Sequence, residues 1–247
     1  MSRRRILVAA RLAAGTVATL TGSERHYLAT VLRLKPGTEL ILADGAGREY
    51  LGSIDRVDSD GVEIAIGDEL PAHRLDGPVI TIYQGMPKGE KLELILQKGT
   101  ELGVGAIVPF YAARSVPRLR DERIEGRLAR WERIAREAAR QCGRPDTPQL
   151  KLSANLADVL LTGEHSVKLL LWEGEKAVGL RQLLADTPRP DSVAVIIGPE
   201  GGLTGEEVAA ARQAGYCSVT MGQRILRTET AGLAILAILQ HVWGDLG

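Results

Sequence analysis

The 247-residue sequence predicts an α/β protein in which a mainly parallel sheet is covered by helices and preceded by a small β-rich module. Three features predict this class. Short β-rich runs separated by turn dipeptides fill the first seventy residues, and strand-like runs alternate with helical stretches from residue 79 onward. Between the two, residues 71–78 supply proline, glycine and charge. We therefore expect two domains, residues 1–72 and 73–247.

The first domain is expected to be built from hairpins. Residues 6–10 (ILVAA) predict a strand, and further strands are expected between residues 38 and 70. Asp44-Gly45 and Asp60-Gly61 interrupt these runs, and an Asp-Gly pair between two strands indicates a hairpin. A helix is expected over residues 23–32, with Ser23 as its N-cap.

The second domain is expected to alternate strands with helices. The strands are predicted at residues 79–84, 106–110, 167–172, 193–197 and 218–221. A helix over residues 88–102 should bury one face and end before Gly103, which is suited to a C-terminal cap. The buried face is formed by Leu92, Ile95, Leu96 and Leu102.

Two further helices differ in polarity. One is basic on its outer side and should turn a single apolar face inward, made of Ile124, Leu128, Trp131, Ala135 and Ala138. The other, over residues 230–242, is apolar nearly all round. Such a helix must be covered on every side, either by the core or by another subunit.

The composition is that of an ordinary globular protein, with 31 basic and 31 acidic side chains. Arg11 interrupts the apolar run that follows the first arginines, and the apolar run at 231–239 is too short to span a bilayer, so we expect a cytoplasmic protein with no membrane segment. No metal site is expected, because the cysteines and histidines lack ligand spacing. These residues are Cys142, Cys217, His26, His73, His165 and His241.

Positive charge is concentrated in one part of the chain. Residues 112–145 contain ten arginines and five acidic residues, and a local block of this kind can bind phosphate although the whole chain is neutral. The alternative is a solvated helix face with internal ion pairs.

The most informative motifs lie in the last quarter of the chain. IIGPEGGLTGEEV (residues 196–208) places a glycine-rich turn after an apolar strand, and Thr204 with Glu207 forms a capping-box pattern for the next helix. MGQRILRTETA (residues 221–231) follows one strand later. Glycines at such turns allow backbone groups to approach a flat ligand, although a tight turn without a ligand is the alternative. Neither the dinucleotide fingerprint nor the P-loop occurs, and the first turn has no basic residue, which suits a ligand without phosphates.

These motifs resemble the SPOUT class of methyltransferases and, within it, the RsmE-type bacterial 16S ribosomal RNA uracil-N3 methyltransferases. Four segments earlier in the chain match the same family in the same order: RHYLATVLRLKPG (25–37), KLELILQKGTELGV (91–104), RSV (114–116) and RWERIAREAARQCGR (130–144). One departure is Leu203, where an aromatic residue is expected in many relatives.

The resemblance implies a fold and partners that the residue patterns do not show. It implies a PUA-like barrel at residues 1–72 that binds RNA, and at residues 73–247 a SPOUT methyltransferase domain with a trefoil knot made by residues 193–231. It also implies a homodimer with cofactor pockets beside the interface, and 16S rRNA of the small ribosomal subunit as substrate.

The implied cofactor is S-adenosyl-L-methionine, without a metal. The resemblance assigns cofactor binding mainly to backbone groups of the two turns and to the end of an earlier strand. The residues are Leu171, Gly198, Pro199, Glu200, Gly201, Gly202, Met221, Gly222, Ile225, Leu226 and Thr228.

Methylation of uracil N3 requires a group that accepts the N3 proton and another that stabilises the resulting negative charge. We assign the proton to Glu200 or Glu229, and the charge to Arg227, with Arg224 as a second choice. The alternatives are structural. Glu200 would bind backbone amides and Glu229 would pair with Arg224 or Arg227, whereas Thr228 and Thr230 would act as caps or clamps.

RNA binding is assigned to exposed cations in both domains, whose neutralisation of phosphates would make affinity fall with salt. These residues are His26, Arg33, Lys88, Lys91, Arg114, Arg118 and Arg144. We expect a flipped-out base to enter the cofactor pocket. Two other functions remain open: methylation of another rRNA or tRNA atom, and a noncatalytic ribosome assembly factor with the same fold.

Overall fold

The computed structural model describes residues 4–8, 12–71, 77–115 and 124–247. The chain forms two compact units, Met1–Arg74 with Ala139–Thr147, and Leu75–Ala138 with Pro148–Gly247. The expected boundary between residues 72 and 73 falls outside the described residues. The association of Ala139–Thr147 with the first unit was not anticipated from the sequence.

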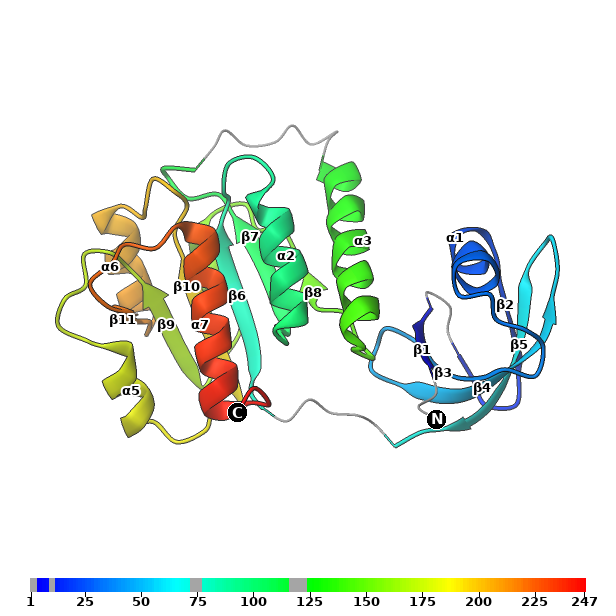
Figure 1. Cartoon of the computed structure of the whole chain (residues 1–247). Helices are drawn as coiled ribbons and strands as arrows, with labels where there is room; N and C mark the ends of the chain where they lie inside the picture. The colour runs from blue at the N-terminus through cyan, green and yellow to red at the C-terminus, as the bar shows by residue number, and fades with distance from the viewer. Residues whose placement is uncertain (1–3, 9–11, 72–76, 116–123) are drawn as a thin grey trace. The chain divides into compact units, whose positions relative to one another are not determined.

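The first unit contains a five-stranded sheet in the order β1-β3-β4-β5-β2 (Figure 1). Its strands are β1 (Arg4–Leu7), β2 (Val17–Leu20), β3 (Glu39–Ala43), β4 (Glu49–Val57) and β5 (Val62–Glu69). The pairs β3–β4 and β4–β5 are antiparallel, which confirms the hairpins predicted at Asp44-Gly45 and Asp60-Gly61. The predicted first strand begins earlier and ends at Leu7, where it pairs in parallel with β3.

The helical segment of the first unit differs from the expected one in its type and in its cap. α1 (Gly22–Arg25) continues into a π-helix, η1 (His26–Val31). Thr21, and not Ser23, is the N-cap, because Thr21 has the extended backbone of a cap whereas Ser23 already lies inside the helix. Leu28 is fully buried and anchors the segment in the core of this unit.

Residues 139–147 are held to the first unit by polar contacts. Arg5 donates to the Gly143 carbonyl at 2.8 Å and also pairs with the buried Glu49. Arg140 donates to the Leu7 carbonyl at 3.1 Å. Together these contacts join the segment to the first unit.

The second unit contains a six-stranded sheet in the order β11-β9-β10-β6-β7-β8, in which every pair is parallel. Its strands are β6 (Val79–Gly85), β7 (Ala106–Phe110), β8 (Gln149–Leu150), β9 (Val167–Leu171), β10 (Ser192–Ile197) and β11 (Cys217–Val219). The parallel sheet and five of its strands are confirmed; the two-residue β8 was not predicted.

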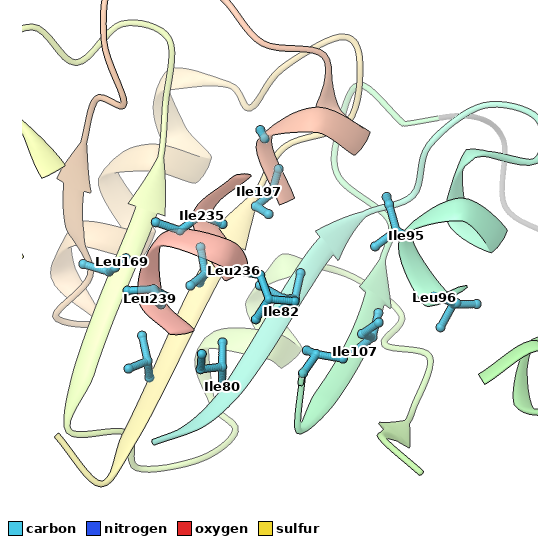
Figure 2. Packing of buried hydrophobic residues seen from close by; sticks show 14 of the residues in the cluster. Ile80, Ile82, Ile95, Leu96, Ile107, Leu169, Ile197, Ile235, Leu236 and Leu239 are labelled. Atoms are coloured by element: carbon cyan, nitrogen blue, oxygen red, sulfur yellow. The ribbon is translucent and has the colours of Figure 1, made fainter. Parts of the chain in front are cut away.

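Helices cover both faces of this sheet. They are α2 (Lys91–Glu101), α3 (Ile124–Cys142), α4 (Leu156–Leu160), α5 (Leu180–Asp186), α6 (Gly205–Gln213) and α7 (Thr228–Trp243). The side chains of β10 alternate between the two cores: Val195 and Ile197 pack with α2, α5 and α7, whereas Ala194 and Ile196 pack with α4 and α6. Figure 2 shows the first of these cores, in which Leu236 and Leu239 of α7 lie over the strands of the sheet.

The last helix buries one face and leaves another partly open. Ile235 and Leu239 are buried, whereas Ile238 and Val242 on the other side are 36% and 45% exposed. The core of the second unit therefore accounts for only part of this apolar surface. In the described part of the chain, no helix combines the length and apolarity needed to cross a bilayer.

Candidate active site at the carboxyl edge of the parallel sheet

The carboxyl ends of parallel strands meet at one edge of a sheet, and ligands commonly bind there. In the second unit, this edge brings together the turns that follow β6, β9, β10 and β11. Leu171 pairs in register with Ile197 and with Val219. The GPEGG turn and the segment that follows β11 therefore begin on the same edge.

Two glycines of this edge allow other parts of the chain to approach closely. A Cβ on Gly85 would lie 2.5 Å from Pro199, and a Cβ on Gly201 would lie 2.9 Å from the Arg114 carbonyl oxygen. Arg114 also donates from Nη1 to the Gly201 carbonyl at 3.3 Å. The GPEGG turn is therefore held between β6 and the loop after β7, and both glycines serve packing of the protein itself.

The start of α6 is fixed as the sequence predicted. Thr204 accepts from the backbone N–H of Glu207 at 3.2 Å, and Glu207 accepts from that of Thr204 at 2.8 Å. Glu207 also accepts from the N–H of Ala113 at 2.8 Å. The capping box therefore orients α6 and ties its first turn to the loop that carries Arg114.

Thr228 joins the two motifs. Its hydroxyl donates to the Gly198 carbonyl at 2.6 Å and accepts from Nε2 of Gln84 at 2.8 Å. Gln84 is fully buried at the end of β6. Thr228, the first residue of α7, thus acts as a clamp between the GPEGG turn and β6.

Three charged side chains of the motifs and α2 form a cluster. Nζ of Lys91 lies 2.7 Å from Oε1 of Glu200 and 3.4 Å from Oε2 of Glu229. The hydrogen bond with Glu200 raises the pKa of Lys91. Burial opposes ionisation of Glu200, but hydrogen bonds from Lys91 and from the backbone N–H groups of Glu200 and Lys88 outweigh it, so the pKa of Glu200 lies below its ordinary value. Both groups are charged at neutral pH.

The segment between β11 and α7 offers backbone groups beside open space. Gly222 has a φ of 126°, and a Cβ built on it would have no neighbour within 4 Å. Ile225 is 84% exposed, whereas Met221 and Leu226 pack against the core. The hydroxyl of Thr220 bonds to both backbone groups of Gly222, at 3.0 and 3.3 Å, and so fixes the turn. A flat, partly apolar ligand without phosphates fits such a segment, because it offers open space and an exposed apolar side chain.

Arg227 is the N-cap of α7 and is exposed. Within the described residues, neither Arg227 nor Arg224 pairs with Glu229, which pairs with Lys91 instead. One form of the structural alternative, an ion pair of Glu229 with these arginines, is therefore not seen in the part of the chain described, whereas a role of Glu229 in orienting the last helix stays open. Arg227 is free to meet a ligand.

The residues predicted to bind RNA have different environments. His26, Arg33, Lys88 and Arg114 are exposed, and Arg33 adopts a left-handed backbone with φ of 52°. Arg144 is buried and pairs with Asp146 at 3.0 Å, and Lys91 belongs to the carboxylate cluster. Arg118 lies outside the described residues. A role in RNA binding stays a prediction for all of them.

A separate cleft of about 600 Å³ lies between α4 and α6. Tyr111, Asn155 and Glu206 are among its lining residues, and no residue of the cofactor-binding set lines it. The predicted cofactor-binding set and this cleft are therefore distinct parts of the second unit. Among the residues that the structure describes, no group of three or more side chains is arranged to hold a metal ion.

Comparison with known proteins identifies the class. Residues 76–240 match the family described as RNA methyltransferase domain, and residues 20–67 match the RNA methyltransferase PUA domain. The chain is 33% identical over 228 residues to ribosomal RNA small subunit methyltransferase E of Bacillus subtilis, covering 90% of this chain and 89% of the relative.

Two solved structures extend the match to three dimensions. A putative methyltransferase from Legionella pneumophila, in complex with its bound cofactor S-adenosylmethionine, is 32% identical with a TM-score of 0.87. Ribosomal RNA small subunit methyltransferase E from Neisseria gonorrhoeae, bound to S-adenosylmethionine, is 31% identical with a TM-score of 0.86. Each match covers 100% of both chains.

The fold and these matches define an RNA methyltransferase of the SPOUT type with an N-terminal PUA-like domain. Within that class, the chain belongs to the ribosomal RNA small subunit methyltransferase E family.

Sequence reasoning missed three features of the site. Gln84 is one of them, although a glutamine in the apolar run VITIYQG is itself a signal of a buried polar contact. Glu173 is another: its carboxylate lies so close to Gly202 that a Cβ on this glycine would be 2.5 Å from Oε1. The pairing of Lys91 with both motif carboxylates had no local signal, because these residues are far apart in the chain.

Proposed function

We propose that the protein transfers a methyl group from S-adenosyl-L-methionine to N3 of a specific uridine in 16S rRNA of the small ribosomal subunit. The observation that carries the proposal is the edge at which the GPEGG turn and the RILRTETA segment meet, linked by the hydrogen bond from Thr228 to Gly198. The names and bound cofactors of the relatives support the choice of donor and substrate.

The residues at this edge fit the proposed cofactor. Residues 198–202 and 221–226 would hold the adenosine part through backbone groups, with Leu171 as an apolar wall beneath them. When bound, the cofactor supplies a methyl group already activated by its sulfonium, so the protein's main task is alignment of donor and acceptor. Gly222 leaves open space for this contact.

Methylation of the uracil requires the protein to remove the N3 proton and to stabilise the negative charge left on the ring. N3 of uracil carries a proton at neutral pH, and a carboxylate near the methyl group must accept it. Arg227 would stabilise the negative charge that spreads over the ring oxygens, since its guanidinium is exposed and permanently charged. Arginine is too weak a base to take the proton itself.

We also propose that the protein acts as a homodimer in the cytoplasm. The partly exposed apolar side of α7, with Ile238 and Val242, supports the dimer because burial against a second copy would complete its coverage. The small-subunit substrate supports the compartment.

Labelled donor tests the proposal. Unmodified deproteinised rRNA and unmodified small subunits are incubated with the protein, and the labelled nucleotide is located by mass spectrometry. We expect N3-methyluridine in 16S rRNA. A label on another atom would favour a different methyltransferase, and a folded protein that binds no donor in calorimetry would favour a noncatalytic assembly factor.

A further inference from the structure

The two carboxylates of the motifs differ in how many hydrogen bonds they receive. Glu200 accepts from the backbone N–H of Lys88 at 3.0 Å on Oε1 and 3.2 Å on Oε2, and from Nζ of Lys91 at 2.7 Å. Its side chain is 24% exposed. Both oxygens are therefore committed to the chain between β6 and α2, and Glu200 anchors the GPEGG turn to that segment.

Glu229 has a different environment in the first turn of α7. Its side chain is 12% exposed, and Oε2 is 3.4 Å from Nζ of Lys91. That distance is an ion pair, but Oε2 is buried and accepts no hydrogen bond in the described part of the chain. A buried carboxylate oxygen without a donor is costly. Oε2 therefore faces Lys91, whereas no hydrogen bond engages Oε1 among the described residues, so Glu229 keeps at Oε1 an acceptor position that Glu200 lacks.

We infer that Lys91 is a positioning residue that gives the two carboxylates different roles. It holds Glu200 in the GPEGG turn and pairs with Oε2 of Glu229, which leaves Oε1 as the open acceptor, so that Glu229 is the base. This inference rests on the proposed function, because it concerns the N3 proton. The proton passes from N3 to Oε1 of Glu229 while N3 bonds the methyl carbon, and the electron pair of the broken sulfur–carbon bond stays on sulfur. The proton then leaves Glu229 for water.

Charged groups surround Glu229 on two sides. Lys91 approaches it from the start of α2 and Glu200 from the loop after β10, so the cluster has one cation and two anions. The N-terminal end of α7 adds a partial positive charge beside Glu229. Loss of Lys91 would leave two neighbouring carboxylates facing each other without a cation between them.

Four variants and one control test the division of roles. Glu229→Gln should lower kcat by about 10²–10⁴-fold, the usual contribution of a general base, and should abolish the acidic limb of the kcat–pH profile. Lys91→Met should lower kcat by a smaller factor and move that limb to higher pH, and Lys91→Arg should restore both. Glu200→Gln should weaken donor binding in calorimetry and keep the limb. Lys98→Met is the matched control, because Lys98 lies on the same helix and pairs only with Glu101 in the described residues.

Two kinetic results would overturn the inference. One is an acidic limb that persists in Glu229→Gln and disappears in Glu200→Gln. The other is a Lys91→Met variant with the limb of the unmodified protein. A limb that shifts equally in Lys98→Met would also contradict it, since the effect would then be a general one of charge.

A measurement without cofactor or RNA separates this inference from the proposed function. Lys91 helps to lower the pKa of Glu200 in the folded state, so the stability it contributes is present above the ordinary value of 4.5 and is lost as pH falls below it. Lys91→Met should therefore have a lower Tm than the unmodified protein at pH 6, and this difference in Tm should shrink as the pH falls to 3. A deficit independent of pH would overturn the role of Lys91. A pH-dependent deficit in a protein that methylates no RNA would instead reject the proposed function alone.

Discussion

The hydroxyl of Thr228 bonds two segments at once, the Gly198 carbonyl and the Gln84 side chain. Thr228→Val keeps the shape and removes both bonds. Because it leaves buried polar groups without a partner, we expect a loss of about 1–3 kcal/mol in the free energy of unfolding, measured with denaturant. Thr228→Ser retains the hydroxyl and should stay close to the unmodified protein. A Thr228→Val variant as stable as the unmodified protein would mean that the two hydrogen bonds do not contribute.

Gly85 tests the packing of the GPEGG turn. An added Cβ would lie 2.5 Å from Pro199. Gly85→Ala should therefore displace the turn, lower stability by about 1–3 kcal/mol as overpacking does, and weaken donor binding in calorimetry. Gly205→Ala is the control, because a Cβ there meets nothing within 4 Å. Unchanged donor affinity in a folded Gly85→Ala protein would show that the position of the turn does not govern binding.

Arg227 tests the charge assignment. It is exposed and makes no ion pair in the described residues, so its removal should leave the fold intact. We expect Arg227→Ala to suppress methyl transfer by about 10²–10³-fold, as loss of a charge-stabilising donor does in other enzymes, while Tm changes little. Activity is measured with labelled donor and Tm by calorimetry. Near-normal turnover would remove Arg227 from the catalytic residues.

Contacts within a few residues were predictable, and contacts across the chain were not. The capping box of Thr204 and Glu207 spans three positions, so the sequence displays it directly. Lys91 and Glu200 are 109 positions apart, and nothing in either segment indicates the other. Lys91 was therefore assigned to RNA, as an exposed cation near the start of a helix would be.

At the scale of elements, Gly126 in α3 offers a test of helix propensity. It is exposed, and a Cβ built on it meets no atom within 4 Å. Gly126→Ala should raise the free energy of unfolding by roughly 0.5–1 kcal/mol, because glycine loses more backbone freedom than alanine in a helix. Gly99 in α2 is the contrast: its Cβ would lie 3.3 Å from Ile107, so Gly99→Ala should gain less or lose. Equal gains at both sites would show that packing around Gly99 adjusts freely.

Long periodic elements were predicted well because their patterns repeat. In α2, Leu92, Ile95 and Leu96 are buried, and Gly103 follows with φ of 81°, although the helix starts at Lys91 and not at residue 88. The sequence did not indicate the short elements β2, β8, α4 and α5, because segments of two to seven residues carry too little periodicity. The π-helix His26–Val31 has no distinct sequence pattern.

At the scale of the whole molecule, the exposed side of α7 tests the proposed homodimer. Ile238→Lys with Val242→Lys would place charge on this surface without entering the core, since both residues are partly exposed. We expect the mass measured by light scattering to fall from that of two chains to that of one. Leu161→Lys is the control, because Leu161 is 87% exposed at the end of α4 and should not change the mass. Retention of the double mass in the α7 variant would place the interface elsewhere.

Some global properties lie beyond what residue patterns can indicate. Strand order in the six-stranded sheet depends on crossovers that no single segment encodes, and the trefoil knot rests on kinship and stays a prediction. The division at residues 72 and 73, inferred from the composition of residues 71–78, also stays a prediction. Residues 139–147 join the first unit through contacts with residues far away in the chain, such as the hydrogen bond from Arg140 to the Leu7 carbonyl.

The clamp at Thr228 also bears on protein synthesis. The GPEGG turn leaves the ribosome before Thr228 does, yet the hydrogen bond that fastens Gly198 comes from that later residue. A nascent chain whose final helix is still inside the exit tunnel therefore lacks this fastening. Capture of the cofactor is expected to follow release of the finished polypeptide, since only then does the closing bond become available.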